Sequence, residues 1–149
     1  MLDDGVTSFF ATYPPLPEFL VEWVKSGRDE EAIPVLEMLK KSDTNIRWGL
    51  QNGVWTFGVS SFPEYIRKTA EYTLSEGDMH KIATPTLILE GEDDKVFRGQ
   101  AGKLAAERRC SHKHVVMRSA DSAGEHCHMG AMRLFHQTVF DWLAKTLAL

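Results

Sequence analysis

The second half of the chain alternates short apolar runs with amphipathic stretches. The run Thr86–Glu90, which lies between a proline and a glycine, is almost wholly apolar and predicts a strand buried on both faces of a parallel sheet. Gly99–Arg109 predicts a helix, and the valine-rich segment His114–Arg118 predicts a second strand. From Met129 to Leu147, apolar residues recur at helical spacing. Strand, helix, strand and helix at these lengths indicate an α/β fold with parallel strands.

The first half of the chain has a helical pattern interrupted by breakers. Apolar residues share one face over Glu18–Lys25, and a second helix is predicted over Asp29–Lys41 with its proline in the first turn. Asp43–Gly58 holds internal glycines and predicts a softer or broken helix. Ser61 begins the pattern Ser-Phe-Pro-Glu, which is typical of a capping box, so a fourth helix is expected from Pro63 to about residue 74.

Composition and charge narrow the class of protein. The chain has 149 residues with a net charge of −4, so no basic surface for nucleic acid or for an anionic membrane is expected. It has no run of about 18 apolar residues and no signal-peptide pattern at its start, so we expect a cytoplasmic protein. Two cysteines are too few for a disulfide framework and indicate reduced thiols.

Two loops carry the residues that are candidates for catalysis. The loop Gly91–Asp94 follows the first predicted strand, and Gly124–His128 follows the second. Because ligands of open α/β sheets bind at the carboxyl ends of the strands, a carboxylate and a histidine can meet there. A catalytic triad needs this pair: the acid orients the imidazole, and the imidazole takes a proton from the nucleophile. Both Asp93 and Asp94 could supply the acid.

The order strand, Gly-x-x-Asp, helix, strand, Gly-x-x-His loop and terminal helix resembles the end of the α/β-hydrolase fold. The chain resembles most closely the FrsA-like hydrolases, among them fungal hydrolases that shorten polyketide pigment precursors and dihydroxypseudooxynicotine hydrolases. The segments that carry the resemblance are Trp48–Gly58, Thr84–Asp94, Gly124–Cys127 and Phe135–Leu143.

The resemblance implies a domain organisation and two catalytic roles. Residues 1–13 would be a loop that follows a core strand missing from the chain, residues 14–81 a helical lid, and residues 82–149 the C-terminal part of the hydrolase core. Asp94, three residues after the glycine, would be the acid, and His126 the general base. No cofactor is implied.

The nucleophile motif of the family, Gly-x-Ser-x-Gly, does not occur in the 149 residues. The nearest string surrounds Ser60 but lacks the closing glycine and lies within the lid segment, where a loop before a helix explains it better. We therefore expect the chain alone to be inactive, as a piece of a serine-type hydrolase that acts on a small-molecule substrate once an N-terminal half completes it. The alternative is a non-catalytic remnant that serves as an interaction module.

The substrate class follows from the resemblance. An ester, or a carbon–carbon bond beside a ketone, in a polyketide-like or aromatic molecule of secondary metabolism is expected. Five lid residues are candidates for binding this substrate, namely Trp48, Gln51, Asn52, Trp55 and Phe57. Packing in a core explains the aromatic members equally well, and solvation on a helix surface explains the two amides.

The remaining histidines, Cys127 and one strand edge bear on metal binding and on association. The histidines on either side of Cys127, and those at 112 and 114, lack the companion spacing of a zinc site, so no metal is expected. Cys127 is expected to pack, because a side chain adjacent to His126 should not reach around the imidazole ring. The strand Thr86–Glu90 has one predicted neighbour, so its other edge is expected to be unpaired and to favour self-association or pairing with an N-terminal half.

Overall fold

The computed structural model describes residues 2–12 and 16–148 and divides into two compact units. One comprises Met1–Thr12 and Leu74–Leu149 and is called the α/β unit below. The other comprises Tyr13–Thr73 and is called the helical unit. The division at residues 73 and 74 lies earlier than the expected end of the lid at residue 81. Among the described residues, no helix combines the length and the apolar character needed to cross a bilayer.

The α/β unit is built on two parallel strands, β1 (Thr86–Gly91) and β2 (His112–Met117), paired in register from Thr86 opposite His112 to Gly91 opposite Met117. This confirms the predicted α/β character. The strand β2 begins two residues earlier than expected, because Thr86 at the start of β1 already pairs with His112.

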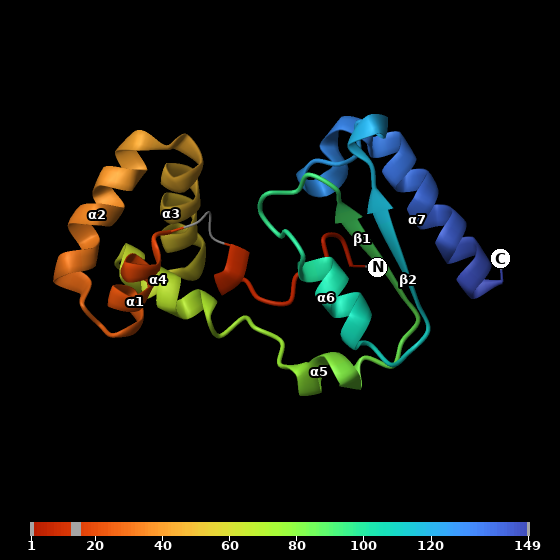
Figure 1. Ribbon diagram of the computed structural model, residues 1–149, viewed down its shortest axis with the longest axis horizontal. Helices are drawn as coiled ribbons and strands as arrows, with labels where there is room; N and C mark the ends of the chain where they lie inside the picture. Colours follow the sequence, from red (N-terminus) through yellow and green to blue (C-terminus); the bar gives the residue numbers. More distant parts are fainter. Residues whose placement is uncertain (1, 13–15, 149) are drawn as a thin grey trace. The chain divides into compact units, whose positions relative to one another are not determined.

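Helices cover both faces of this small sheet (Figure 1). Alternate side chains of a strand point to opposite faces, so Leu87 and Leu89 pack with Val139 of α7 (Met132–Leu147), while Ile88 packs with Leu104 of α6 (Gln100–Glu107). The three β1 side chains are fully buried, as predicted for a strand covered on both faces. The helix α7 begins three residues later than expected, since η3 (His126–Ala131) forms a short 3-10 segment before it.

The free edge of β1 is partly covered by the chain's own N-terminus. Leu2 forms a parallel bridge opposite Ile88, its amide donates to the Leu87 carbonyl at 2.8 Å, and its carbonyl accepts from the Leu89 amide at 3.0 Å. The expectation of a wholly unpaired edge is therefore wrong. The reason is that the first residues run along β1 rather than away from it.

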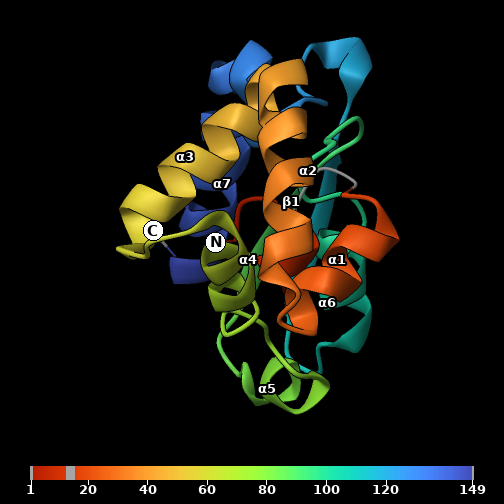
Figure 2. The same ribbon diagram turned by 90° about the vertical axis from the view of Figure 1, so that its left-hand side faces the viewer.

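The described residues of the helical unit form four helices (Figure 2), namely α1 (Glu18–Lys25), α2 (Asp29–Ser42), α3 (Thr44–Phe57) and α4 (Phe62–Thr69). They pack pairwise around buried side chains such as Leu20, Leu36, Leu50 and Ile66. The proline of α2 lies in the second turn rather than the first.

The predicted softness of α3 is wrong, since the helix is continuous. The Asp43 carboxylate accepts from the amides of Asn45 and Ile46 at its start, and Gly58 ends it in the left-handed conformation with φ of 62°. Its internal glycine Gly53 is buried directly against a tyrosine ring, which supplies the packing that the glycine itself lacks.

The helix α4 is shorter than predicted and is followed by a helix that the pattern missed. The Ser61 hydroxyl accepts from the Glu64 amide as expected, but the Glu64 carboxylate accepts from the amide and hydroxyl of Ser60. The missed helix α5 (Glu76–Lys81) begins with a complete capping box between Ser75 and Asp78. Since α5 belongs to the α/β unit, it accounts for the earlier division of the chain.

Candidate active site

The two loops that follow β1 and β2 cross each other at their glycines. A Cβ on Gly91 would lie 2.6 Å from the Gly124 carbonyl oxygen, so only glycine permits this approach. The Asp93 amide donates to the same carbonyl at 2.8 Å. This crossing brings the loop that carries Asp94 next to the loop that carries His126.

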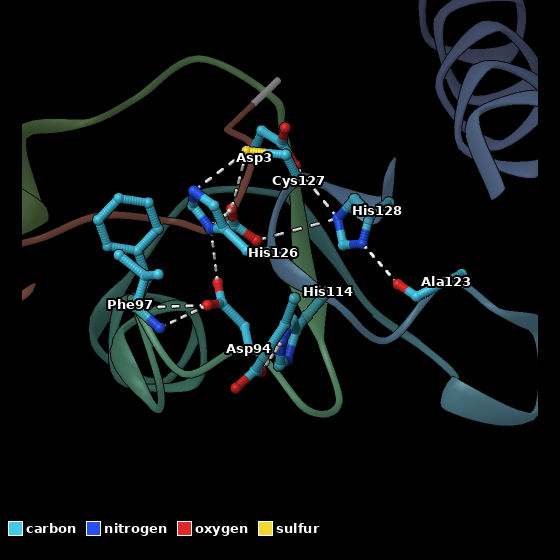
Figure 3. Close-up of polar contacts among 11 residues, drawn as sticks. Asp3, Asp94, Phe97, His114, Ala123, His126, Cys127 and His128 are labelled. Carbon is cyan, nitrogen blue, oxygen red and sulfur yellow. Dashed lines mark hydrogen bonds and ion pairs between the residues drawn. The ribbon is translucent and has the colours of Figure 1, made fainter. Parts of the chain in front are cut away.

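Asp94 lies against the imidazole of His126, with its Oδ2 at 3.2 Å from Nδ1 (Figure 3). The carboxylate is 4% exposed, and its Oδ1 accepts from the amides of Val96 and Phe97 at 2.7 and 3.3 Å. The Phe97 ring meets the imidazole edge-on at 5.0 Å between centroids. Asp94 is therefore held by backbone donors on one oxygen and presents the other to His126.

The competing carboxylate, Asp93, has a different partner. It accepts a hydrogen bond from the Ser119 hydroxyl, next to an ion pair between Glu92 and Arg118 at 2.8 Å. The structure thus brings Asp94, and not Asp93, to the histidine, as the spacing from Gly91 indicated.

A second carboxylate, Asp4, approaches the same nitrogen and was not foreseen. Its Oδ2 lies 3.3 Å from His126 Nδ1, and the residue is 3% exposed. Burial, together with the neighbouring carboxylates of Asp3 and Asp94, raises the pKa of Asp4 to about 6, although the nearby histidines oppose the shift. The available signal was the acidic pair before Gly5, where Asp4 adopts φ of 59° in a tight turn.

Cys127 contacts the other side of the imidazole, which contradicts the expectation that it could not reach around the ring. Its Sγ lies 3.3 Å from His126 Nε2 and 3.9 Å from Asp4 Oδ2. Cys127 has φ of 55°, and this left-handed backbone turns the side chain back over its neighbour. Burial and then the carboxylate of Asp4 raise the pKa of the thiol to about 11, so it stays protonated near neutral pH and is a poor nucleophile.

Carboxylate, imidazole and thiol atoms gather here closely enough to share a metal ion. In the described part of the chain two such groups are present, one of Asp4, His126 and Cys127 and the other of Asp3, Asp4 and His128. The histidine spacing alone did not predict them, because Asp3 and Asp4 lie more than a hundred residues earlier in the sequence.

The predicted substrate-binding residues lie on α3, in the helical unit. Trp48, Gln51, Asn52 and Trp55 follow the spacing i, i+3, i+4, i+7 and therefore share one face. The two tryptophans are 67% and 81% exposed, so they are not core residues of this unit. Phe57 differs, since its ring packs on Tyr65 and Tyr72 at 5.2 and 5.3 Å.

Ser60, the only serine near a nucleophile-like string, is part of a helix-entry turn. Its hydroxyl donates to the Glu64 carboxylate at 2.8 Å, and the residue is exposed. This agrees with the structural interpretation of the string, because the hydroxyl is bonded to a carboxylate whose pKa is lowered by the hydrogen bonds from Ser60, and such a carboxylate is a weak base.

Comparison with known proteins points to fungal hydrolases. The hydrolase LUC6 of a Fusarium species is 25% identical over 121 residues, which cover 77% of this chain and 29% of that protein. The 20-hydroxy-prefusarin hydrolase FUS2 of Gibberella moniliformis is 26% identical over 160 aligned positions, which cover 99% of this chain and 37% of that protein. No family model matches the chain, and no solved structure matches it. The chain thus resembles fungal hydrolases and spans about a third of the length of these relatives.

Proposed function

We propose that this chain carries the acid and the base of a serine-type α/β-hydrolase, with Asp94 as the acid and His126 as the base. The observation that carries the proposal is the contact of 3.2 Å between Asp94 Oδ2 and His126 Nδ1, made by loops that follow two adjacent parallel strands. The similarity to fungal hydrolases supports the same class of reaction.

The geometry suits the work of a catalytic base. Asp94 accepts the Nδ1 proton, which leaves the lone pair on Nε2 to take a proton from a nucleophile. The imidazolium that forms is stabilised by the buried carboxylate, whose own charge is held by two backbone amides. The His126 side chain is 40% exposed, so this ring is not sealed inside the α/β unit.

The nucleophile of this proposal is a serine in a Gly-x-Ser-x-Gly elbow outside these 149 residues. Cys127 Sγ takes the position beside Nε2 that the serine oxygen would need, so the thiol has to turn away when the serine engages. This rotation is compatible with a neutral thiol that forms only weak hydrogen bonds.

We propose an ester, or a carbon–carbon bond beside a ketone, in a polyketide-like or aromatic molecule as the substrate. The exposed face of α3 supports this choice, since Trp48 and Trp55 present large aromatic surfaces while Gln51 and Asn52 add amide groups. Phe57 contributes by holding α3 in place rather than by contact with substrate, because its ring packs on two tyrosines.

The test is complementation followed by labelling of the active serine. The chain is co-expressed with the Gly-x-Ser-x-Gly-bearing N-terminal half of a related hydrolase, and a fluorophosphonate probe reports the activated serine. We expect labelling of the complemented protein and none of the chain alone. Asp94→Asn and His126→Gln should each lower the labelling rate by on the order of 10³-fold or more. The matched control Asp93→Asn, which alters a carboxylate bonded to Ser119, should label normally.

Two outcomes would contradict the proposal. Labelling of the isolated chain that Ser60→Ala abolishes would place the nucleophile in the helix-entry turn. If labelling of the complemented protein depends on Asp93 and not on Asp94, the assignment of Asp94 as the acid is wrong. If the complemented, folded protein never labels, the alternative of a non-catalytic interaction module stands.

A further inference from the structure

Three buried acceptor atoms face one another beside the Asp94–His126 pair. His128 Nε2 lies 3.1 Å from Asp3 Oδ1 and 4.0 Å from Asp4 Oδ1. His128 is fully buried and Asp4 is 3% exposed. Apart from the 3.1 Å contact between His128 and Asp3, none of these three atoms has a hydrogen-bond partner among residues 2–12 and 16–148. Buried polar atoms with so few partners are rare because their lost hydration is not replaced, so this group of three is a candidate binding site.

The hydrogen-bond partner of His128 Nδ1 shows which ring nitrogen carries the hydrogen. Nδ1 lies 2.8 Å from the Ala123 carbonyl oxygen, and a carbonyl can only accept, so Nδ1 carries the hydrogen (Figure 3). When the ring is neutral, as it is in a metal ligand, Nε2 points a lone pair at the two carboxylates. An imidazole that donates one N–H to a backbone carbonyl while its other nitrogen faces acidic groups has the arrangement of a metal ligand.

The acidic side chains of this cluster suit a cation. Within the described residues the ion pairs of Asp3 and Asp4 are formed with histidines, and no lysine or arginine neutralises them. Metal binding would displace the proton shared by His128 and the two carboxylates, and the deprotonated group would carry a charge of −2, which a divalent ion balances. An imidazole ligand selects zinc-like transition metals over calcium or magnesium.

We propose that Asp3, Asp4 and His128 form a divalent transition-metal site of the zinc class. The ligand atoms lie within 4.8 Å of one another. Ligands at about 2.0–2.2 Å from one ion are separated by about 3–3.5 Å, so small movements of the carboxylates from the present 3.1 and 4.0 Å suffice.

Such a site would act as a structural clasp, and its existence does not depend on the proposed hydrolase activity. It joins the turn at Asp3 and Asp4, which follows the bridge at Leu2, to the loop that carries His126. It would also hold the Asp4 charge on the ion, so Asp94 becomes the carboxylate that His126 Nδ1 uses. The neighbouring group with Cys127 is the less suitable one, since it would occupy the ring of the proposed base and needs a thiolate.

The test is zinc binding to the full chain after removal of metal with a chelator. Calorimetry should give one zinc per chain, and zinc should raise the Tm in a way that the chelator reverses. Asp3→Asn keeps the size of a partly exposed side chain and should raise the Kd for zinc by at least about 10-fold. The matched control Asp141→Asn, on the exposed side of α7, should bind as the original chain does.

Two spectroscopic measurements separate this site from other ways of binding zinc. The Nε2 resonance of His128 should shift on zinc addition in the unaltered chain, and a cobalt-loaded chain should lack a sulfur-to-cobalt charge-transfer band. Failure to bind zinc would overturn the proposal and leave His128 as a protonated partner of Asp3. Binding that Asp3→Asn does not weaken, or a sulfur band from Cys127, would also overturn it.

Discussion

Two glycines of α3 offer a matched test of how the helical unit is packed. A Cβ added at Gly53 would lie 1.9 Å from Cζ and 2.0 Å from Cε1 of Tyr65, within the ring itself. A Cβ added at Gly49, one turn earlier in the same helix, would meet nothing within 4 Å. Alanine at the two positions should therefore change stability in opposite directions.

The magnitudes follow from the contact. Alanine in place of glycine inside a helix stabilises by about 0.5–1 kcal/mol, which is the full effect expected for Gly49→Ala. At Gly53 the added methyl displaces a tyrosine that is 4% exposed and packs on Phe57. Loss of part of its buried area costs about 2–4 kcal/mol, so the net expectation for Gly53→Ala is a destabilisation of about 1–3 kcal/mol.

Urea unfolding followed by tryptophan fluorescence measures this directly. Three of the four tryptophans, Trp23, Trp48 and Trp55, lie in the helical unit, so the signal reports mainly on its unfolding. The midpoint should fall for Gly53→Ala and rise slightly for Gly49→Ala. If Gly53→Ala matched or exceeded the original stability, the packing of α3 on α4 described above would be refuted.

Three more perturbations test other parts of the molecule. The hydrogen bond from Arg67 holds the pKa of Asp29 below its usual 3.8, so this pair stabilises the helical unit above that pH and ceases to do so as pH falls through the lowered value. Asp29→Asn should lower the free energy of unfolding in urea by about 0.5–1 kcal/mol at pH 7 and leave it unchanged in strong acid. An equal decrease at both pH values would contradict the ion pair. Gly124→Ala places a Cβ 2.9 Å from the Ser119 backbone and should destabilise the α/β unit by about 1–3 kcal/mol in thermal unfolding, and an unchanged Tm would argue against the close approach of Gly124 to Ser119. Leu2→Pro removes a backbone donor to β1 and should increase association in sedimentation, whereas an unchanged monomer fraction would show that this bridge does not protect the edge.

Much of the candidate site was predictable because it depends on local pattern and on strand order. The apolar run of β1, the valines of β2 and the spacing of the aspartate and histidine after each strand are readable without a structure. Parallel strands end at the same edge of a sheet, so Asp94 and His126 had to come close once both strands were assigned. The helix α5 was not predicted because its short polar stretch lacks helical periodicity, although the capping pair Ser75 and Asp78 can be recognised in the sequence.

The sequence by itself determined both strands, most of the helices, the α/β class and the pair of loops that carry the acid and the base. Tertiary structure alone decided which further groups join them. Asp3 and Asp4 reach His126 and His128 because Leu2 docks along β1, a contact between segments more than eighty residues apart. No periodicity or spacing encodes such a contact, since it depends on which backbone groups at the sheet edge are left to pair. The left-handed turn at Cys127, likewise, is set by the crowded loops around it rather than by the preference of a cysteine.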